Sequence, residues 1–206
     1  MIYFLISGIT LGFSAAFTPG PFQPFLLNQT STFGWKKTIP SAFAPLISDG
    51  PIIILMVFLL SQAPAWFLNG LFIAGGLFIL YLAWGAFKAY RDYEEAAAGG
   101  RDLSQTTAKR LGQAALINAL GPGPWIFWSL IAGPIFLEGW RESQINGMSF
   151  MLGFYGTLIG GNLFFIALFA SAQRFGSRLN RALIGFSALA LLGLGLVQLT
   201  RGIQNI

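Results

Sequence analysis

One acidic residue, Asp49, lies within a long apolar stretch, between Pro45 and Pro51. The other acidic residues all lie in polar segments: Asp92, Glu94, Glu95, Asp102, Glu138 and Glu142. Burying a carboxylate at the centre of a membrane-spanning helix costs about 3 kcal/mol, and no Lys, Arg or His lies in the same stretch to offset this cost. We therefore expect Asp49 to take up and release a proton, or to bind a substrate ammonium group. The alternative is a neutral aspartic acid hydrogen-bonded to backbone that the prolines leave open.

Two Pro-Gly-Pro triplets, Pro19-Gly20-Pro21 and Pro122-Gly123-Pro124, lie 103 positions apart, at matching places in the two halves of the chain. Proline removes a backbone donor and glycine tolerates unusual backbone angles, so each triplet is predicted to interrupt a helix. The half-helix that follows presents its partly positive N-terminus to the opening. Two openings entering from opposite faces predict a binding centre for an anionic group near the membrane midplane. The alternative is that each triplet only kinks its helix around a neighbour.

Three further side chains are predicted to line the same centre. Asn118 precedes the second triplet, Trp125 follows it directly, and Asn162 follows a pair of glycines in a later apolar segment. A role in helix packing is the alternative for each of them. The chain contains neither Cys nor His, so we predict no metal site built from these residues, no disulfide and no cofactor.

Six apolar segments are predicted to position these residues as membrane-spanning helices. Each is long enough to cross about 30 Å of hydrocarbon at about 1.5 Å per residue. Their approximate bounds are 2–17 continuing through 22–27, then 39–60, 66–90, 111–137, 148–172 and 183–199. The first and fourth contain the triplets and are expected to be broken. Two glycine pairs, Gly8 with Gly12 and Gly156 with Gly160, predict close contacts between helices.

The composition supports a membrane protein. Hydrophobic residues make up 55% of the 206 residues and charged residues only 9%, whereas soluble domains contain about 25% charged residues. The net charge of +5 comes from Lys and Arg in the connections rather than along one element, so nucleic-acid binding is not predicted. No nucleophile stands out beside a base, so enzymatic activity is not predicted either.

The basic residues indicate an orientation. Only Arg141 and Arg201 fall on one side of the predicted membrane, whereas ten fall in the connections after the first, third and fifth helices: Lys36, Lys37, Lys88, Arg91, Arg101, Lys109, Arg110, Arg174, Arg178 and Arg181. These connections should be cytoplasmic and both termini outside.

Because each half has three helices, equivalent helices should cross in opposite directions. The prediction is an all-α membrane protein with a 3+3 inverted repeat, formed by residues 1–90 and 111–206 and joined by a charged cytoplasmic loop, 91–110.

Gly12-Phe13, the first Pro-Gly-Pro triplet, Gly34 and Asp49 follow a pattern that resembles the lysine-exporter (LysE/RhtB) family of bacterial amino-acid exporters. Residues 74–85 and 181–196 also resemble helices of that family. The resemblance implies a multi-pass protein of the bacterial inner membrane that exports amino acids or similar small metabolites in exchange for protons. It does not identify the substrate, because the family usually has Asn-Pro-Lys where this chain has Gly121-Pro122-Gly123.

Two other functions stay open beside export. A divalent-cation transporter would use Asp49 as a ligand, although hard cations prefer more than one carboxylate. A membrane scaffold protein would not require a carboxylate between two prolines. The partners expected from the sequence are a small-molecule substrate, the lipid bilayer and protons, and a homodimer is left open.

Overall fold

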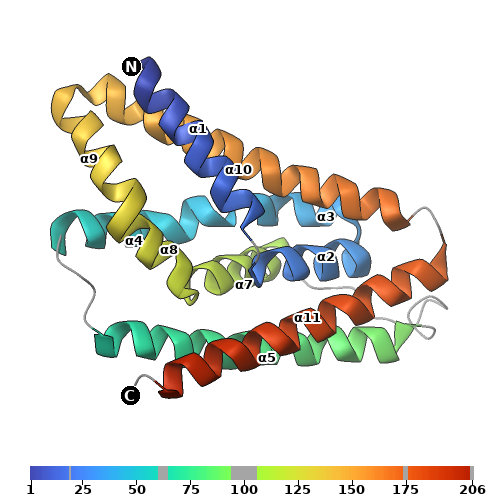
Figure 1. The fold of residues 1–206 in the computed structure, drawn as a ribbon. Coiled ribbons are helices and arrows are strands. Elements are labelled where there is room, and N and C mark those ends of the chain that lie inside the picture. Colours follow the sequence, from blue (N-terminus) through green and yellow to red (C-terminus); the bar gives the residue numbers. More distant parts are fainter. Residues whose placement is uncertain (19, 60–64, 94–105, 174–175, 205–206) are drawn as a thin grey trace.

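The computed structural model describes residues 1–206 except 19, 60–64, 94–105, 174–175 and 205–206 (Figure 1). All regular structure in this part of the chain is helical, as the sequence predicts. Its elements are α1 (Ile2–Phe17), α2 (Phe22–Phe33), α3 (Trp35–Thr38), the 3-10 helix η1 (Ile39–Phe43), α4 (Ala44–Leu59), α5 (Ala65–Arg91), α7 (Thr107–Ala119), α8 (Pro122–Phe127), the π-helix η3 (Trp128–Ala132), α9 (Gly133–Glu142), α10 (Gln144–Gln173) and α11 (Ser177–Gln204).

Four helical segments of the described chain are long and apolar enough to cross a membrane on their own: 35–55, 72–91, 144–172 and 177–204. Two further pairs of helices meet the same criteria only when taken together. These are α1 with α2 and α7 with the helical stretch 122–142, and each pair bends by more than 40° at a short break. The described part of the chain therefore has four to six candidate membrane-spanning segments, and both bent pairs contain a Pro-Gly-Pro triplet.

Several helices run beyond their predicted bounds. The first predicted segment ends at residue 27, whereas α2 continues to Phe33 and buries Gln29 and Thr30 among neighbouring helices. The helix ends at Gly34, whose φ of 85° favours glycine. The predicted loop 138–146 is also shorter than expected, since only Ser143 separates α9 from α10. At α2, tertiary burial outweighs the low helix propensity of polar residues such as Thr30. The extension of α9 over residues 138–142 is mostly exposed, and it contains Glu and Arg, which favour helices.

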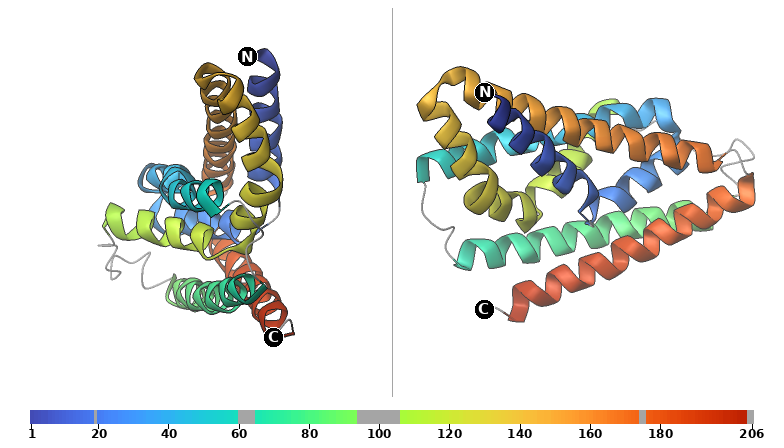
Figure 2. Two further views of the ribbon diagram at one scale, coloured as in Figure 1. Left: turned by 90° about the vertical axis from the view of Figure 1, so that its left-hand side faces the viewer. Right: turned by 45° about the horizontal axis from the view of Figure 1, so that its top comes forward.

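The helices pack in three pairs. α5 and α11 run antiparallel along one side of the molecule, and α1 and α10 run parallel on the opposite side (Figures 1 and 2). α4 packs against α7, also in a parallel direction, between these two layers. Two apolar cores result: one joins α2, α5, α7 and α11, and the other joins α1, η3 and α10.

Glycines allow α1 and α10 to approach closely. A Cβ atom added at Gly8 would meet the carbonyl oxygen of Phe150, and one added at Gly12 would meet that of Phe154, so the predicted close contact at this pair is confirmed. The prediction for Gly156 and Gly160 is wrong, because no atom lies within 4 Å of a Cβ added at either position. On α10 the close contacts come instead from other glycines, among them Gly153.

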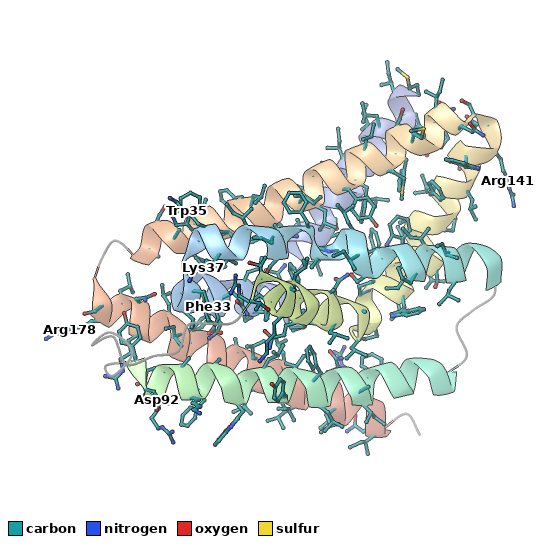
Figure 3. All side chains as sticks on the ribbon, turned by 180° about the vertical axis from the view of Figure 1, so that it is seen from behind. Phe33, Trp35, Lys37, Asp92, Arg141 and Arg178 are labelled. Carbon is teal, nitrogen blue, oxygen red and sulfur yellow. The ribbon has the colours of Figure 1, made fainter. Side chains whose placement is uncertain are left out.

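Charged residues gather at opposite ends of the helices. Lys37, Asp92 and Arg178 lie at one end of the molecule and Arg141 lies at the other (Figure 3). The start of α1 and the end of α11 lie at the end that carries the junction of α9 and α10, and therefore at the end of Arg141 (Figures 1 and 2). This separation along the helix axes is typical of a membrane protein whose two ends face different compartments.

Candidate functional site

A cavity of about 660 Å³ brings both Pro-Gly-Pro regions together with Asp49. Of the residues predicted to form the site, eight line this cavity: Gly20, Pro21, Asp49, Asn118, Pro122, Gly123, Pro124 and Asn162. Pro19 lies outside the described residues. The cavity walls also include members of both apolar cores, so the cavity lies where the two cores meet. Its volume falls within the range of sites that enclose small solutes.

The Asp49 carboxylate accepts hydrogen bonds from three different elements. The Asn118 amide of α7 donates to Oδ1 at 2.7 Å, and the Tyr155 hydroxyl of α10 donates to Oδ2 at 3.2 Å. The Trp128 indole of η3 donates to Oδ2 at 3.4 Å. Asp49 itself is 3% exposed. These partners are all uncharged, so within the part of the chain that the structure describes the carboxylate is held as an acceptor without a fixed cation beside it.

Asn118 connects two neighbouring residues of α4. Its amide nitrogen donates to Ser48 Oγ at 2.7 Å as well as to Asp49, and Ser48 in turn donates to the Ala44 carbonyl oxygen at 3.2 Å. The partners found for Asp49 are therefore side chains of other helices. Backbone left open by Pro45 and Pro51, which the sequence offered as the alternative partner, supplies none of the three hydrogen bonds to Asp49.

A π-turn places Trp128 against Asp49. The Gly133 amide bonds to the Trp128 carbonyl oxygen five residues earlier, and Pro134 has no amide to continue the usual α-helical pattern. A Cβ atom on residue 133 would collide with the same carbonyl oxygen. The indole packs edge-on against Phe154 at a centroid distance of 5.2 Å. Local backbone geometry and aromatic packing thus fix the indole N–H toward the carboxylate.

Glutamine and tryptophan side chains satisfy the carbonyl groups that the two breaks leave open. At the second break, Trp125 Nε1 donates to the Ala119 oxygen at 2.8 Å and Gln198 Nε2 donates to the Leu120 oxygen at 3.4 Å. At the first, Gln23 Nε2 donates to the Ala16 oxygen at 2.9 Å. Lipid cannot satisfy such groups, so in a membrane these contacts would replace the missing helical hydrogen bonds.

A comparison with known families decides the class of protein. The sequence model of the family described as LysE type translocator matches residues 13–202. The chain belongs to this family. The match confirms the resemblance noted in the sequence and makes the chain a membrane transport protein. No match was found among curated proteins or among solved structures.

The translocator holds the remaining predicted residues in two different ways. Asn162 is 1% exposed, lines the cavity, and donates to the Ala42 carbonyl oxygen of η1 at 3.3 Å. Trp125 is buried but does not line the cavity, because its indole closes the second break. The structure thus places Asn162 in the cavity wall and gives Trp125 a contact with the backbone.

Several residues of the translocator site were not singled out from the sequence. No role in the site is predicted from the sequence for Trp128, Tyr155, Gln23, Gln198 or Arg201. Gln198 and Arg201 could have been found from their spacing, because two polar residues recur with Leu194 at helical intervals in an apolar segment. All three line the cavity on α11. Tyr155 carried none, since it lies in an apolar segment 106 residues from Asp49.

Proposed function

We propose that this translocator is a secondary transporter that exports amino acids or similar small metabolites in exchange for protons. One observation carries the proposal: a buried carboxylate, held by three neutral donors, forms part of the wall of a cavity. With no cation fixed beside it, Asp49 can be neutralised either by a proton or by a substrate ammonium group. Competition of the two for one carboxylate produces antiport.

The cavity-lining residues of both breaks form the rest of the proposed substrate site. Proline and glycine at positions 20, 21 and 122–124 present backbone and ring surfaces rather than long side chains, and Asn118 and Asn162 add amide groups. This combination suits a small solute that carries both polar and apolar groups. Asp49 is the proposed proton-coupling residue within this set.

We also propose that the two halves form an inverted repeat. The packing supports this, because α1 of the first half packs parallel to α10 of the second half, and α7 of the second half packs parallel to α4 of the first. A twofold rotation that exchanges the two halves would exchange the α1–α10 pair with the α7–α4 pair. The same rotation would exchange α5 with α11, which pack against each other. Because these pairs join helices of both halves, movement of the α5–α11 pair relative to the α1–α10 pair would alternate access to the cavity.

The proposed orientation follows from the separated charges. The end that holds Lys37 and Arg178 would face the cytoplasm, and the end that holds Arg141 and both termini would face outward, in a bacterial inner membrane. With this orientation the cytoplasmic charges meet the anionic inner leaflet, which attracts basic residues.

Reconstitution in lipid vesicles with an imposed pH gradient tests the proposal. Wild-type protein is expected to drive uptake of at least one radiolabelled proteinogenic amino acid into vesicles that are more acidic inside than outside. Asp49→Asn keeps the shape of the side chain but cannot exchange a proton, so this uptake should be lost. Asp92→Asn makes the same change at one end of the molecule, outside the cavity, and serves as the matched control.

Either of two outcomes would contradict the proposal. The first is that no amino acid moves through wild-type protein under any gradient. The second is that Asp49→Asn transports as well as wild type, which would leave Asp49 with a structural role.

A further inference from the structure

Two side chains of opposite charge line the cavity. Among the described residues of its wall, Asp49 and Arg201 alone are charged. Asp49 is buried, whereas Arg201 is exposed and lies in the last turn of α11, so the two differ in depth. The remaining polar groups between the helices are neutral, such as Asn118 and Gln198. A wall with one carboxylate and one guanidinium is matched by a solute that carries both charges.

The packing of α11 fixes Arg201 on the cavity side. Leu194, Val197, Gln198 and Arg201 recur at helical spacing and all line the cavity. The adjacent face of α11 is pressed against α5, where a Cβ added at Gly202 would come within 2.9 Å of the Ile73 amide nitrogen. Because this contact leaves little room for the helix to rotate, the stripe that contains Arg201 stays directed toward the cavity.

We infer that Arg201 determines specificity by binding the carboxylate of the substrate, while Asp49 binds its ammonium group. This inference rests on the proposed transport function. A guanidinium presents two parallel N–H groups that match the oxygens of a carboxylate, and a lysine ammonium cannot reproduce that fork. Arg201 also repels solutes that carry only positive charge, so amines and metal cations are disfavoured in the same cavity.

A second role for an arginine at a helix end is anchoring at the membrane interface, with the charge directed to water. The two roles differ in what they do to substrate choice. An anchoring residue would affect stability and all substrates alike. A carboxylate-binding residue would affect substrates according to whether they carry a carboxylate.

Binding to purified protein, measured by displacement or calorimetry, separates these roles. Each proteinogenic L-amino acid is tested on wild-type protein, and the strongest binder is compared with its methyl ester, which keeps the ammonium group and loses the negative charge. Wild-type protein should bind the acid roughly tenfold or more tightly than the ester, which is the affinity difference expected from one charge-assisted hydrogen bond. Arg201→Gln should reduce this preference to within about twofold by weakening acid binding.

Three other variants make the test specific. Arg201→Lys keeps the charge and should retain part of the preference. Arg141→Gln removes the exposed cation on α9 that does not line the cavity, and should bind like wild type. Asp49→Asn should weaken binding of the acid and the ester together, because both carry the ammonium group. Melting temperatures in detergent show whether each variant is folded.

The outcomes distinguish this inference from the proposal on which it rests. If Arg201→Gln keeps the wild-type preference for acid over ester, or weakens acid and ester equally, Arg201 does not bind the carboxylate, and amino-acid transport still stands. If no amino acid binds wild-type protein at all, the proposed function fails and the role of Arg201 fails with it.

Discussion

At the scale of single residues, the site is a carboxylate surrounded by neutral donors. A buried ion pair would hold Asp49 permanently charged and already occupied, whereas hydrogen bonds from Asn118, Trp128 and Tyr155 stabilise the carboxylate and leave it available to a proton or an ammonium group. Each donor comes from a different element. The site therefore depends on α4, α7, η3 and α10 keeping their relative positions.

Removal of one donor should weaken transport without abolishing it. Tyr155→Phe keeps the ring, which packs edge-on against Phe154 at 5.1 Å, and removes only the hydroxyl that donates to Asp49. Loss of one hydrogen bond of ordinary strength predicts a fall in initial transport rate of about two- to tenfold. Tyr81→Phe, at an exposed position on α5, is the matched control and should transport at the wild-type rate. Equal rates for the two variants would show that the Tyr155 hydroxyl has no part in transport.

The sequence pointed to Asp49 and Asn118 as members of one centre, but not to Trp128 or Tyr155 as partners of Asp49. A lone carboxylate in an apolar segment stands out by composition alone, and so do the two proline triplets. Trp128 and Tyr155 are 79 and 106 positions away from Asp49, and both resemble ordinary apolar packing residues. Only the three-dimensional arrangement of the helices gives them a common neighbour.

At the scale of elements, irregular turns place the side chains that line the site. The 3-10 helix η1 precedes Asp49 in the second span, and the π-helix η3 carries Trp128 in the fourth. Such turns within membrane helices are common near functional sites. The sequence predicts the break at each Pro-Gly-Pro triplet, but η3 depends on Gly133 and Pro134, which were not recognised as a signal.

A methyl group at Gly133 tests the importance of the π-turn. Gly133→Ala places its Cβ against the Trp128 carbonyl oxygen, so η3 must rearrange and move the indole away from Asp49. We expect the initial transport rate to fall about tenfold or more, because indole packing and the hydrogen bond change together. This fall exceeds the two- to tenfold range expected for loss of one donor. Gly112→Ala on α7, where an added Cβ meets no atom within 4 Å, should transport like wild type. Unchanged transport in Gly133→Ala would mean that η3 tolerates an α-helical geometry.

The contact between α1 and α10 depends on small residues. Gly8→Ala would place a methyl group against the Phe150 carbonyl oxygen, so the helices must separate and the melting temperature in detergent should fall by several degrees. Gly156→Ala on α10 makes the same change where nothing lies within 4 Å. It should leave the melting temperature unchanged or raise it slightly, since alanine favours the helix. If both variants melt like wild type, the glycine contact does not contribute to stability.

At the scale of the whole molecule, the cavity lies where two apolar cores meet. The pair of α5 and α11 belongs to one core and the pair of α1 and α10 largely to the other, and α4 and α7 lie between the two pairs (Figure 2). Relative movement of two packed bodies opens and closes a space between them more readily than movement within one core. The periodicity of the sequence indicated the helices, but not which of them pack together.

Single cysteines can test the proposed orientation, because the natural sequence contains none. Arg141→Cys and Arg178→Cys introduce thiols at exposed positions at opposite ends of the molecule (Figure 3). A membrane-impermeant maleimide should label Arg141→Cys in intact cells and Arg178→Cys only after the membrane is permeabilised. The reverse pattern would show that the basic end faces outward.

The central claim is that Asp49 exchanges a proton for the substrate, and proton movement tests it most directly. Vesicles that contain the protein and a trapped pH-sensitive dye start at equal pH on both sides, and the amino acid with the highest transport rate is added outside. Antiport moves a proton out for each substrate molecule that enters, so the internal pH should rise with wild-type protein and stay constant with Asp49→Asn. An equal rise with Asp49→Asn, or substrate entry through wild type with no change in pH, would contradict the account.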